Sequence, residues 1–167
     1  MKIKKVAKYL LLNNFTKNLQ NFLPKTYKKD WHLQLASAAN KNVFQWSIIL
    51  KKENKCIGQI TCQNSYDENE KIKNDNIRDV GWFLDSNYHG MGYGYEAAKK
   101  MIDYMFKEVE IDKIETCAAI DNIASWRIME KLGFKRIDKI KMIKYTMLEK
   151  ETKCYCYEIT RDRYLNN

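Results

Sequence analysis

Hydrophobic positions change their spacing near Val43, and this change divides the chain into two parts. Before Val43, apolar residues recur three or four positions apart in two stretches, which predicts helices over 6–12 and 27–39. After Val43, short stretches rich in β-branched and aromatic residues alternate with polar turns, which predicts strands. The first three predicted strands cover 43–50, 56–63 and 78–84. We expect the first two to form a hairpin, and the charged stretch 67–76 to be a surface loop.

Helices and strands alternate in the second half of the chain. Residues 92–109 have apolar side chains three and four positions apart, as an amphipathic helix does. A second helix is predicted over 123–132, with Gly133 where a helix commonly ends on a glycine. The remaining predicted elements are strands over 114–120, 134–145 and 152–160. This order predicts one α+β domain over residues 1–167, with a parallel strand–helix–strand crossover.

The composition fits a packed domain. Hydrophobic residues make up 45% of the chain and aromatic residues 13%, which is enough for a packed core. At 167 residues the chain is long enough for one domain and too short for two ordinary ones. No stretch of about 18 apolar residues occurs, so we expect no membrane-spanning segment and no membrane partner. The basic start of the chain lacks a small-residue cleavage site, so we do not interpret it as a signal peptide.

The cysteines indicate a reducing compartment. There are five, none in a C-x-x-C pair, and only His32 and His89 could join them around a metal. Cys154 and Cys156 lie two positions apart, so on a strand they share a face and cannot easily bridge each other. We therefore expect reduced thiols, a cytoplasmic protein and no metal site.

Positive charge is concentrated at the start of the chain. The net charge is +9, and residues 1–41 hold nine lysines against a single acid, Asp30. Such a segment could attract RNA, a ribosome surface or an anionic substrate. A solvated lysine-rich surface explains it more simply, because the lysines are scattered and arginine is absent there.

A glycine-rich turn precedes the amphipathic helix and is the most informative stretch. Gly90, Gly92 and Gly94 are spaced by two, so side chains leave the backbone N–H groups there uncovered. The helix start adds the positive end of its dipole, and together these form an anion-binding turn that suits a pyrophosphate. Neither the dinucleotide fingerprint nor the P-loop lysine is present. The simpler alternative is a flexible loop that needs positive φ angles.

A second segment begins the later helix. Asn122 is placed as its N-terminal cap, and Ser125 follows three residues on, in the first turn. Capping residues and first-turn hydroxyls are common, so alone these two residues indicate little.

Together, the two segments resemble the GNAT superfamily of N-acetyltransferases, in particular the branch of ribosomal-protein N-terminal acetyltransferases. The pyrophosphate turn of that family reads Q/R-x-x-G-x-G/A. The turn of this chain that matches it is His89, Gly90, Met91, Gly92, Tyr93 and Gly94, with histidine in the first place. The second family signature is N-x-x-S-x-x-(apolar)-x-E-K-x-G-F. Its matches are Asn122, Ser125, Ile128, Glu130, Lys131, Gly133 and Phe134.

The resemblance implies a fold and a co-substrate. The implied fold is a mixed, mostly antiparallel twisted sheet with a splayed parallel strand pair and helices on both faces. The implied co-substrate is acetyl-CoA, bound where that pair separates. Backbone groups of Phe83 and Leu84 would hold the pantetheine arm, and Asn122 would bind the arm from the other side. The six residues of the turn, His89 to Gly94, would hold the pyrophosphate.

The resemblance also implies a reaction, in which an amine attacks the thioester directly. The enzyme must deprotonate the ammonium, stabilise the oxyanion with a backbone N–H and protonate the leaving thiolate. By analogy Ser125 is the candidate donor to the thiolate, and Asp79 the candidate base; a solvated carboxylate at a strand start is an equal alternative for Asp79. The acceptor would be a protein N-terminus or a small amine, and the protein a monomer or homodimer.

Four departures from the family pattern support a second interpretation. The usual N-terminal strand segment is not evident, so we expect that strand to be missing or supplied by a partner. Met129 replaces the tyrosine found in many relatives, Tyr95 replaces the usual threonine or serine after the turn, and His89 lacks the constant charge of arginine. The alternative is therefore a CoA-binding regulatory module with weak or no turnover. A nucleic-acid-associated basic protein is the third possibility.

Overall fold

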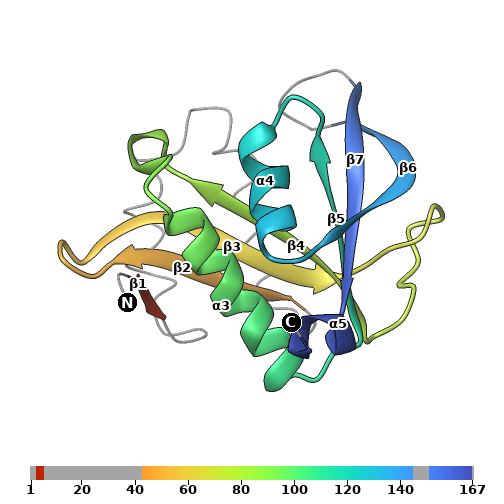
Figure 1. The fold of residues 1–167 in the computed structure, drawn as a ribbon, viewed down its shortest axis with the longest axis horizontal. Helices are drawn as coiled ribbons and strands as arrows, with labels where there is room; N and C mark the ends of the chain where they lie inside the picture. Colours follow the sequence, from red (N-terminus) through yellow and green to blue (C-terminus); the bar gives the residue numbers. More distant parts are fainter. Residues whose placement is uncertain (1–2, 6–42, 145–150, 167) are drawn as a thin grey trace. The chain divides into compact units, whose positions relative to one another are not determined.

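The computed structural model describes residues 3–5, 43–144 and 151–166. Their order in Figure 1 is β1 (Ile3–Lys5), β2 (Phe44–Leu50), β3 (Lys55–Asn64), β4 (Ile77–Leu84), η2 (Ser86–Tyr88), α3 (Tyr93–Lys107), β5 (Lys113–Ala119), α4 (Ile123–Lys131), β6 (Lys135–Lys144), β7 (Glu151–Thr160) and α5 (Arg161–Leu165). The chain forms two compact units, and β3, β4 and α3 each run through both. The first unit comprises Met1–Cys62 and Gly81–Ala97, and the second Gln63–Val80 and Ala98–Asn167.

The first unit is an antiparallel arrangement built on the predicted hairpin. β2 pairs with β3 from Phe44↔Cys62 to Leu50↔Lys55, and β1 pairs with β2 on its other side. Burial alternates along β2, because every second side chain points to the core. A core cluster of this unit consists of Ile48, Leu50, Ile57 and Ala97, with Leu84, Tyr88 and Tyr93 packed against them.

The expectation that the N-terminal strand is missing is wrong. β1 is a three-residue strand, and its register with β2 runs from Ile3↔Leu50 to Lys5↔Ile48. A strand of this length shows too few alternations for its sequence to reveal it, and two of its three residues are lysines. The predicted helices 6–12 and 27–39, and with them the prediction of helices on both faces, involve residues outside the described part of the chain.

The second unit contains the parallel pair and confirms the mixed sheet. β4 and β5 are parallel, but their register covers only Ile77–Asp79 against Lys113–Glu115. β5 then pairs antiparallel with β7 over its full length, and β7 lies between β5 and β6 (Figure 1). Both parallel strands continue beyond the paired residues, so their ladder ends early, as expected for a splayed pair.

Helix α3 carries the apolar stripe that the sequence predicted. Its fully buried side chains in the second unit are Ala98, Met101, Ile102, Met105 and Phe106. Helix α4 ends at Lys131 with Leu132 as its C-terminal cap, and Gly133 follows with a φ of +91°, the left-handed conformation expected of a glycine at this position. Within the described ranges, no helix is both long and apolar enough to span a bilayer.

Gly58 on β3 shows how tightly strands pack in the first unit. A Cβ at this position would lie 2.2 Å from the carbonyl oxygen of Phe83 and 3.0 Å from the Cα of Leu84. Gly58→Ala should therefore destabilise the protein by about 3 kcal/mol, because the atoms it meets are backbone and cannot easily move. Gly81→Ala is the matched control, since its Cβ would meet only the Thr61 hydroxyl at 3.5 Å. Urea unfolding of both variants checks this, and equal midpoints would contradict it.

Candidate functional site

The glycine-rich turn is built by the end of β4 and the start of α3. The backbone N–H of Asp85 donates to the carbonyl of Ile57 at 2.8 Å, which anchors the end of β4 to β3. The Asp85 carboxylate then accepts a hydrogen bond from the backbone N–H of Asn87 at 2.9 Å and caps η2. The chain passes through Gly90 and Gly92 and enters the fifteen-residue helix α3 at Tyr93. The local sequence thus places the turn at the mouth of a long helix.

Two glycines of this turn adopt conformations that other residues avoid. Gly90 has a φ of +74° and Gly92 a φ of +83°, both in the left-handed region. A Cβ at either position would meet nothing within 4 Å, so the space beside this backbone is open. Within the described part of the chain, the amide nitrogens of Gly90, Met91 and Gly92 have no hydrogen-bond acceptor. Open donors at a helix start fit an anion such as a pyrophosphate.

The His89 side chain forms a hydrogen bond with the end of β4. The His89 ring nitrogen Nε2 lies 2.9 Å from the carbonyl oxygen of Leu84, so Nε2 carries the proton and donates it. The Phe83 carbonyl packs against Gly58 of β3, where a Cβ would lie only 2.2 Å from its oxygen. His89 therefore holds the turn against the strand end. The third predicted glycine, Gly94, is buried in the first turn of α3.

Lys55 brings a positive charge to the turn that was not predicted from the sequence. Its ammonium lies 5.2 Å from the centre of the Tyr88 ring, just before the turn. A hydrogen bond with Tyr88 is the main cause that raises the pKa of Lys55. This cation belongs to β3, thirty-three positions before Tyr88, and the two meet because the end of β4 is anchored to β3. No local sequence signal could have shown it.

In the second unit, Asn122 and Ser125 lie together at the start of α4. The Asn122 side chain accepts a hydrogen bond from the backbone N–H of Ser125 at 3.3 Å, which confirms Asn122 as the N-terminal cap. Trp126 fixes the same turn, because its indole N–H donates to the carbonyl of Ile120 at 3.2 Å. Among the described residues, the Ser125 hydroxyl has no hydrogen-bond partner, so its proton is available.

Asp79 stands on β4 at the last residue of the parallel ladder. Burial is the largest effect on its carboxyl and raises the pKa to about 6. Hydrogen bonding from Thr116 and the backbone of Val80, and the charge of Lys141, oppose this rise only in part. Thr116 has a single hydroxyl proton and donates it to the Val80 carbonyl at 2.8 Å, which limits its help to Asp79. A carboxyl with this pKa can accept a proton near neutral pH.

Glu115, the register partner of Asp79 on β5, behaves in the opposite way. Burial would raise its pKa, but hydrogen bonds from Lys113 and Lys73 outweigh burial and lower the pKa to about 2. Lys113 lies 2.7 Å from its carboxylate, and Lys73 pairs with its other oxygen. Glu115 thus stays ionised while Asp79 titrates. Neighbouring carboxyls with separated pKa values are typical of acid–base sites, although structural ion pairs also produce them.

Two cysteines lie beside this pair of acids. The Sγ atoms of Cys117 and Cys156 are 3.1 Å apart on paired positions of β5 and β7. Burial, followed by the contact with Cys156, raises the pKa of Cys117 to about 12. Neither forms a disulfide, and the raised pKa of Cys117 keeps its thiol protonated, so Cys117 is no ready nucleophile near neutral pH.

Glu130 and Met129 of the second signature have structural roles. Met129 is buried at 2% exposure, and the Tyr157 hydroxyl donates to the Glu130 carboxylate at 3.0 Å. Burial and this acid raise the pKa of Tyr157 to about 12. The tyrosine therefore keeps its proton and ties α4 to β7.

Comparisons with known proteins agree with this geometry. The model of the family described as Acetyltransferase (GNAT) domain matches residues 4–135. The chain is 32% identical over 95 residues to the uncharacterized N-acetyltransferase YnaD of Bacillus subtilis (strain 168), covering 57% of this chain and 52% of YnaD. It is 30% identical over 77 residues to the putative ribosomal N-acetyltransferase YdaF of the same organism, covering 46% of this chain and 39% of YdaF. The chain thus spans about half or less of the length of these relatives.

A solved structure shows the same fold. A chimera of the spermidine N-acetyltransferase SpeG from Vibrio cholerae and hSSAT superposes with a TM-score of 0.72 at 14% identity. The match covers 99% of this chain and 98% of that one. At this identity the likeness concerns the fold alone.

Proposed function

Since the chain belongs to the GNAT acetyltransferase domain family, we propose that it is an enzyme that transfers an acetyl group from acetyl-CoA to a primary amine. The turn before α3 carries this proposal, because two glycines in the left-handed region leave its backbone amides open to an anion. A pyrophosphate offers negative charge and several acceptor oxygens, so it suits donors at the start of a long helix.

The proposed contacts with acetyl-CoA follow the family resemblance residue by residue. Backbone groups of Phe83 and Leu84 hold the pantetheine arm, and the amides of 90–94 hold the pyrophosphate. Asn122 donates from its side-chain amide nitrogen. The capping bond from Ser125 supports this role, because it uses the Asn122 oxygen and leaves the nitrogen free to donate.

Two side chains handle the protons in this proposal. Acetyl-CoA supplies the thioester, whose acetyl carbon the amine attacks. Asp79 takes a proton from the ammonium of the acceptor, a role supported by its pKa of about 6. Ser125 donates its hydroxyl proton to the leaving thiolate, a role supported by the absence of a competing partner among the described residues.

The acceptor is proposed as a class, either a small amine or a protein N-terminus. The name of YdaF refers to ribosomal acetylation, and the solved chimera is named for spermidine. Both acceptors present a primary amine that is protonated near neutral pH, so both need a base such as Asp79.

Calorimetry with acetyl-CoA and a thiol-release assay with a panel of amines test this function. The panel comprises spermidine, free amino acids and short peptides with free N-termini. We expect saturable acetyl-CoA binding and thiol release with at least one acceptor. A chain that does not bind acetyl-CoA would overturn the proposal.

A regulatory module that binds CoA without turnover is the second candidate. Met129 favours it, because a buried methionine stands where many relatives have a tyrosine acid. Binding of acetyl-CoA without thiol release from any amine would select this candidate.

The Ser125 hydroxyl can be tested without disturbing the helix start. Ser125→Ala keeps the backbone N–H that binds Asn122, so cofactor affinity should stay within about twofold. Turnover should fall about tenfold or more, since the leaving thiolate loses its proton donor. Ser125→Thr keeps a hydroxyl and is the matched control. Single-turnover rates with saturating acetyl-CoA measure the effect, and an unchanged rate for the alanine variant would remove Ser125 from the mechanism.

A further inference from the structure

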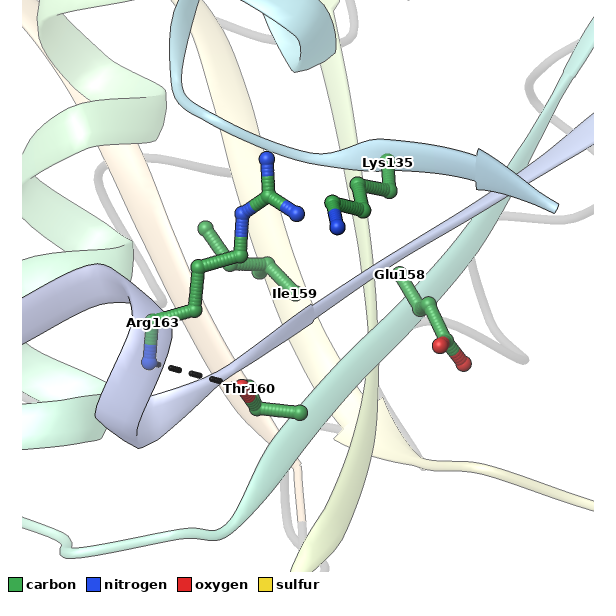
Figure 2. A pocket seen from close by; sticks show the side chains of 5 residues that line it. All are labelled: Lys135, Glu158, Ile159, Thr160 and Arg163. Carbon is green, nitrogen blue, oxygen red and sulfur yellow. Dashed lines mark hydrogen bonds between the residues drawn. The ribbon is translucent and has the colours of Figure 1, made fainter. Parts of the chain in front are cut away.

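A concave site lies in the unit formed by Gln63–Val80 and Ala98–Asn167. It is a pocket of about 540 Å³ at the start of β6, the end of β7 and the start of α5. Its lining residues, drawn in Figure 2, are Lys135, Glu158, Ile159, Thr160 and Arg163. None of them has a role in the proposed acetyl transfer, so the pocket needs its own explanation.

Two positive charges converge in this pocket. Figure 2 shows the Lys135 ammonium and the Arg163 guanidinium pointing toward one another across it. Within the described ranges, neither cation forms a salt bridge with an acid. The Arg163 Nε is buried and lacks a hydrogen-bond partner among the described residues. Two cations directed at one space repel each other unless an anion lies between them.

The acid in the lining does not neutralise this pair. The Glu158 carboxylate points away from Arg163 in Figure 2 and lies 3.4 Å from the ammonium of Lys113. Lys135 and Glu158 are register partners on β6 and β7, so the strand pairing places the lysine at the pocket edge. The charge facing the cavity is therefore positive.

Thr160 adds a hydroxyl donor at the same place. Its oxygen accepts the backbone N–H of Arg163 at 3.4 Å and caps α5. A hydroxyl that accepts one hydrogen bond still has its own proton to donate. The pocket thus combines a guanidinium fork, an ammonium and a hydroxyl donor.

We propose that this pocket binds the phosphate group of a small phosphorylated molecule. The Arg163 fork matches two oxygens of a phosphate, Lys135 supplies the second charge, and Thr160 donates to a third oxygen. The volume exceeds that of a phosphate ion and lies in the range of small-molecule sites, so the rest of an ester fits as well.

Amide NMR tests the proposal on the full chain, because it distinguishes this pocket from the turn before α3. Inorganic phosphate is titrated at constant ionic strength while the Thr160 and Arg163 amide signals are followed. We expect saturable shifts there in the wild type. Lys135→Gln and Arg163→Gln should each weaken the apparent affinity about tenfold, the loss expected for one charge-assisted contact.

Lys144→Gln is the matched control, since it removes the same charge from the other end of β6 and should leave the affinity unchanged. Arg163→Lys, which keeps the charge and loses the fork, should fall between the wild type and the glutamine variant. Adenosine monophosphate and glucose 6-phosphate then compete as probes, and binding of either at least as tight as phosphate supports the proposal. Unsaturable shifts, equal affinity of Lys135→Gln and the wild type, or failure of both esters would overturn it.

Discussion

Replacing Gly92 by glutamate should weaken acetyl-CoA binding about a hundredfold. Gly92 adopts a φ of +83°, and a side chain there forces an L-residue into the left-handed region at about 1–2 kcal/mol. The new carboxylate also places negative charge beside the donors proposed to bind the pyrophosphate. Together these effects approach 3 kcal/mol, which corresponds to about two orders of magnitude in the dissociation constant.

Calorimetry measures this loss, and Gly92→Ala separates its two causes. The alanine variant has the backbone strain without the charge, so it should lie between the wild type and the glutamate variant. Both variants carry the same backbone strain of about 1–2 kcal/mol, so their thermal midpoints should fall by a similar few degrees. If the glutamate variant bound acetyl-CoA as tightly as the wild type, the pyrophosphate would have to bind elsewhere.

Asp79→Asn should lower kcat/KM by about 10²–10⁴-fold, the usual contribution of a general base. The pKa of Asp79 is raised to about 6, so kcat/KM of the wild type should rise with pH through this value as the carboxyl ionises. The asparagine variant cannot ionise and should lose this rising limb. Glu115→Gln should retain a rising limb, because Glu115 has a pKa of about 2 and is already ionised.

The Asp79→Asn variant should lose activity but gain stability at high pH. The folded state holds the pKa of Asp79 above its ordinary value, so its protonated form is favoured on folding. The contribution of protonated Asp79 to the free energy of unfolding is complete below about pH 4 and is lost as the pH rises through about 6. Asp79→Asn should therefore melt higher than the wild type at pH 8, with the difference vanishing at pH 4. An asparagine variant that kept the wild-type pH profile would show that another group is the base.

Strong sequence signals predicted most of the described fold. The hairpin, the amphipathic α3 and the capped α4 were all predicted, because periodicity and capping chemistry are local. β1 and α5 were missed, since elements of three and five residues contain too few positions to show a period.

The site was predictable where its chemistry is carried by the backbone. Glycine at positions 90 and 92 predicted the positive φ angles, and asparagine at 122 predicted the capping hydrogen bond. The environment of Asp79 could not be predicted, because its pKa depends on burial and on Thr116 of β5, thirty-seven positions away. For the same reason, the pairing of Lys55 with Tyr88 appears only once β3 and the turn are placed together.

The turn before α3 limits which of its positions can be substituted during evolution. Its donors are main-chain groups, and the Met91 side chain between the two glycines is 56% exposed. If the turn binds a pyrophosphate as proposed, binding depends on backbone shape, so substitutions at Met91 should have little effect while both glycines must be kept. Related sequences could then diverge widely and still bind the same ligand.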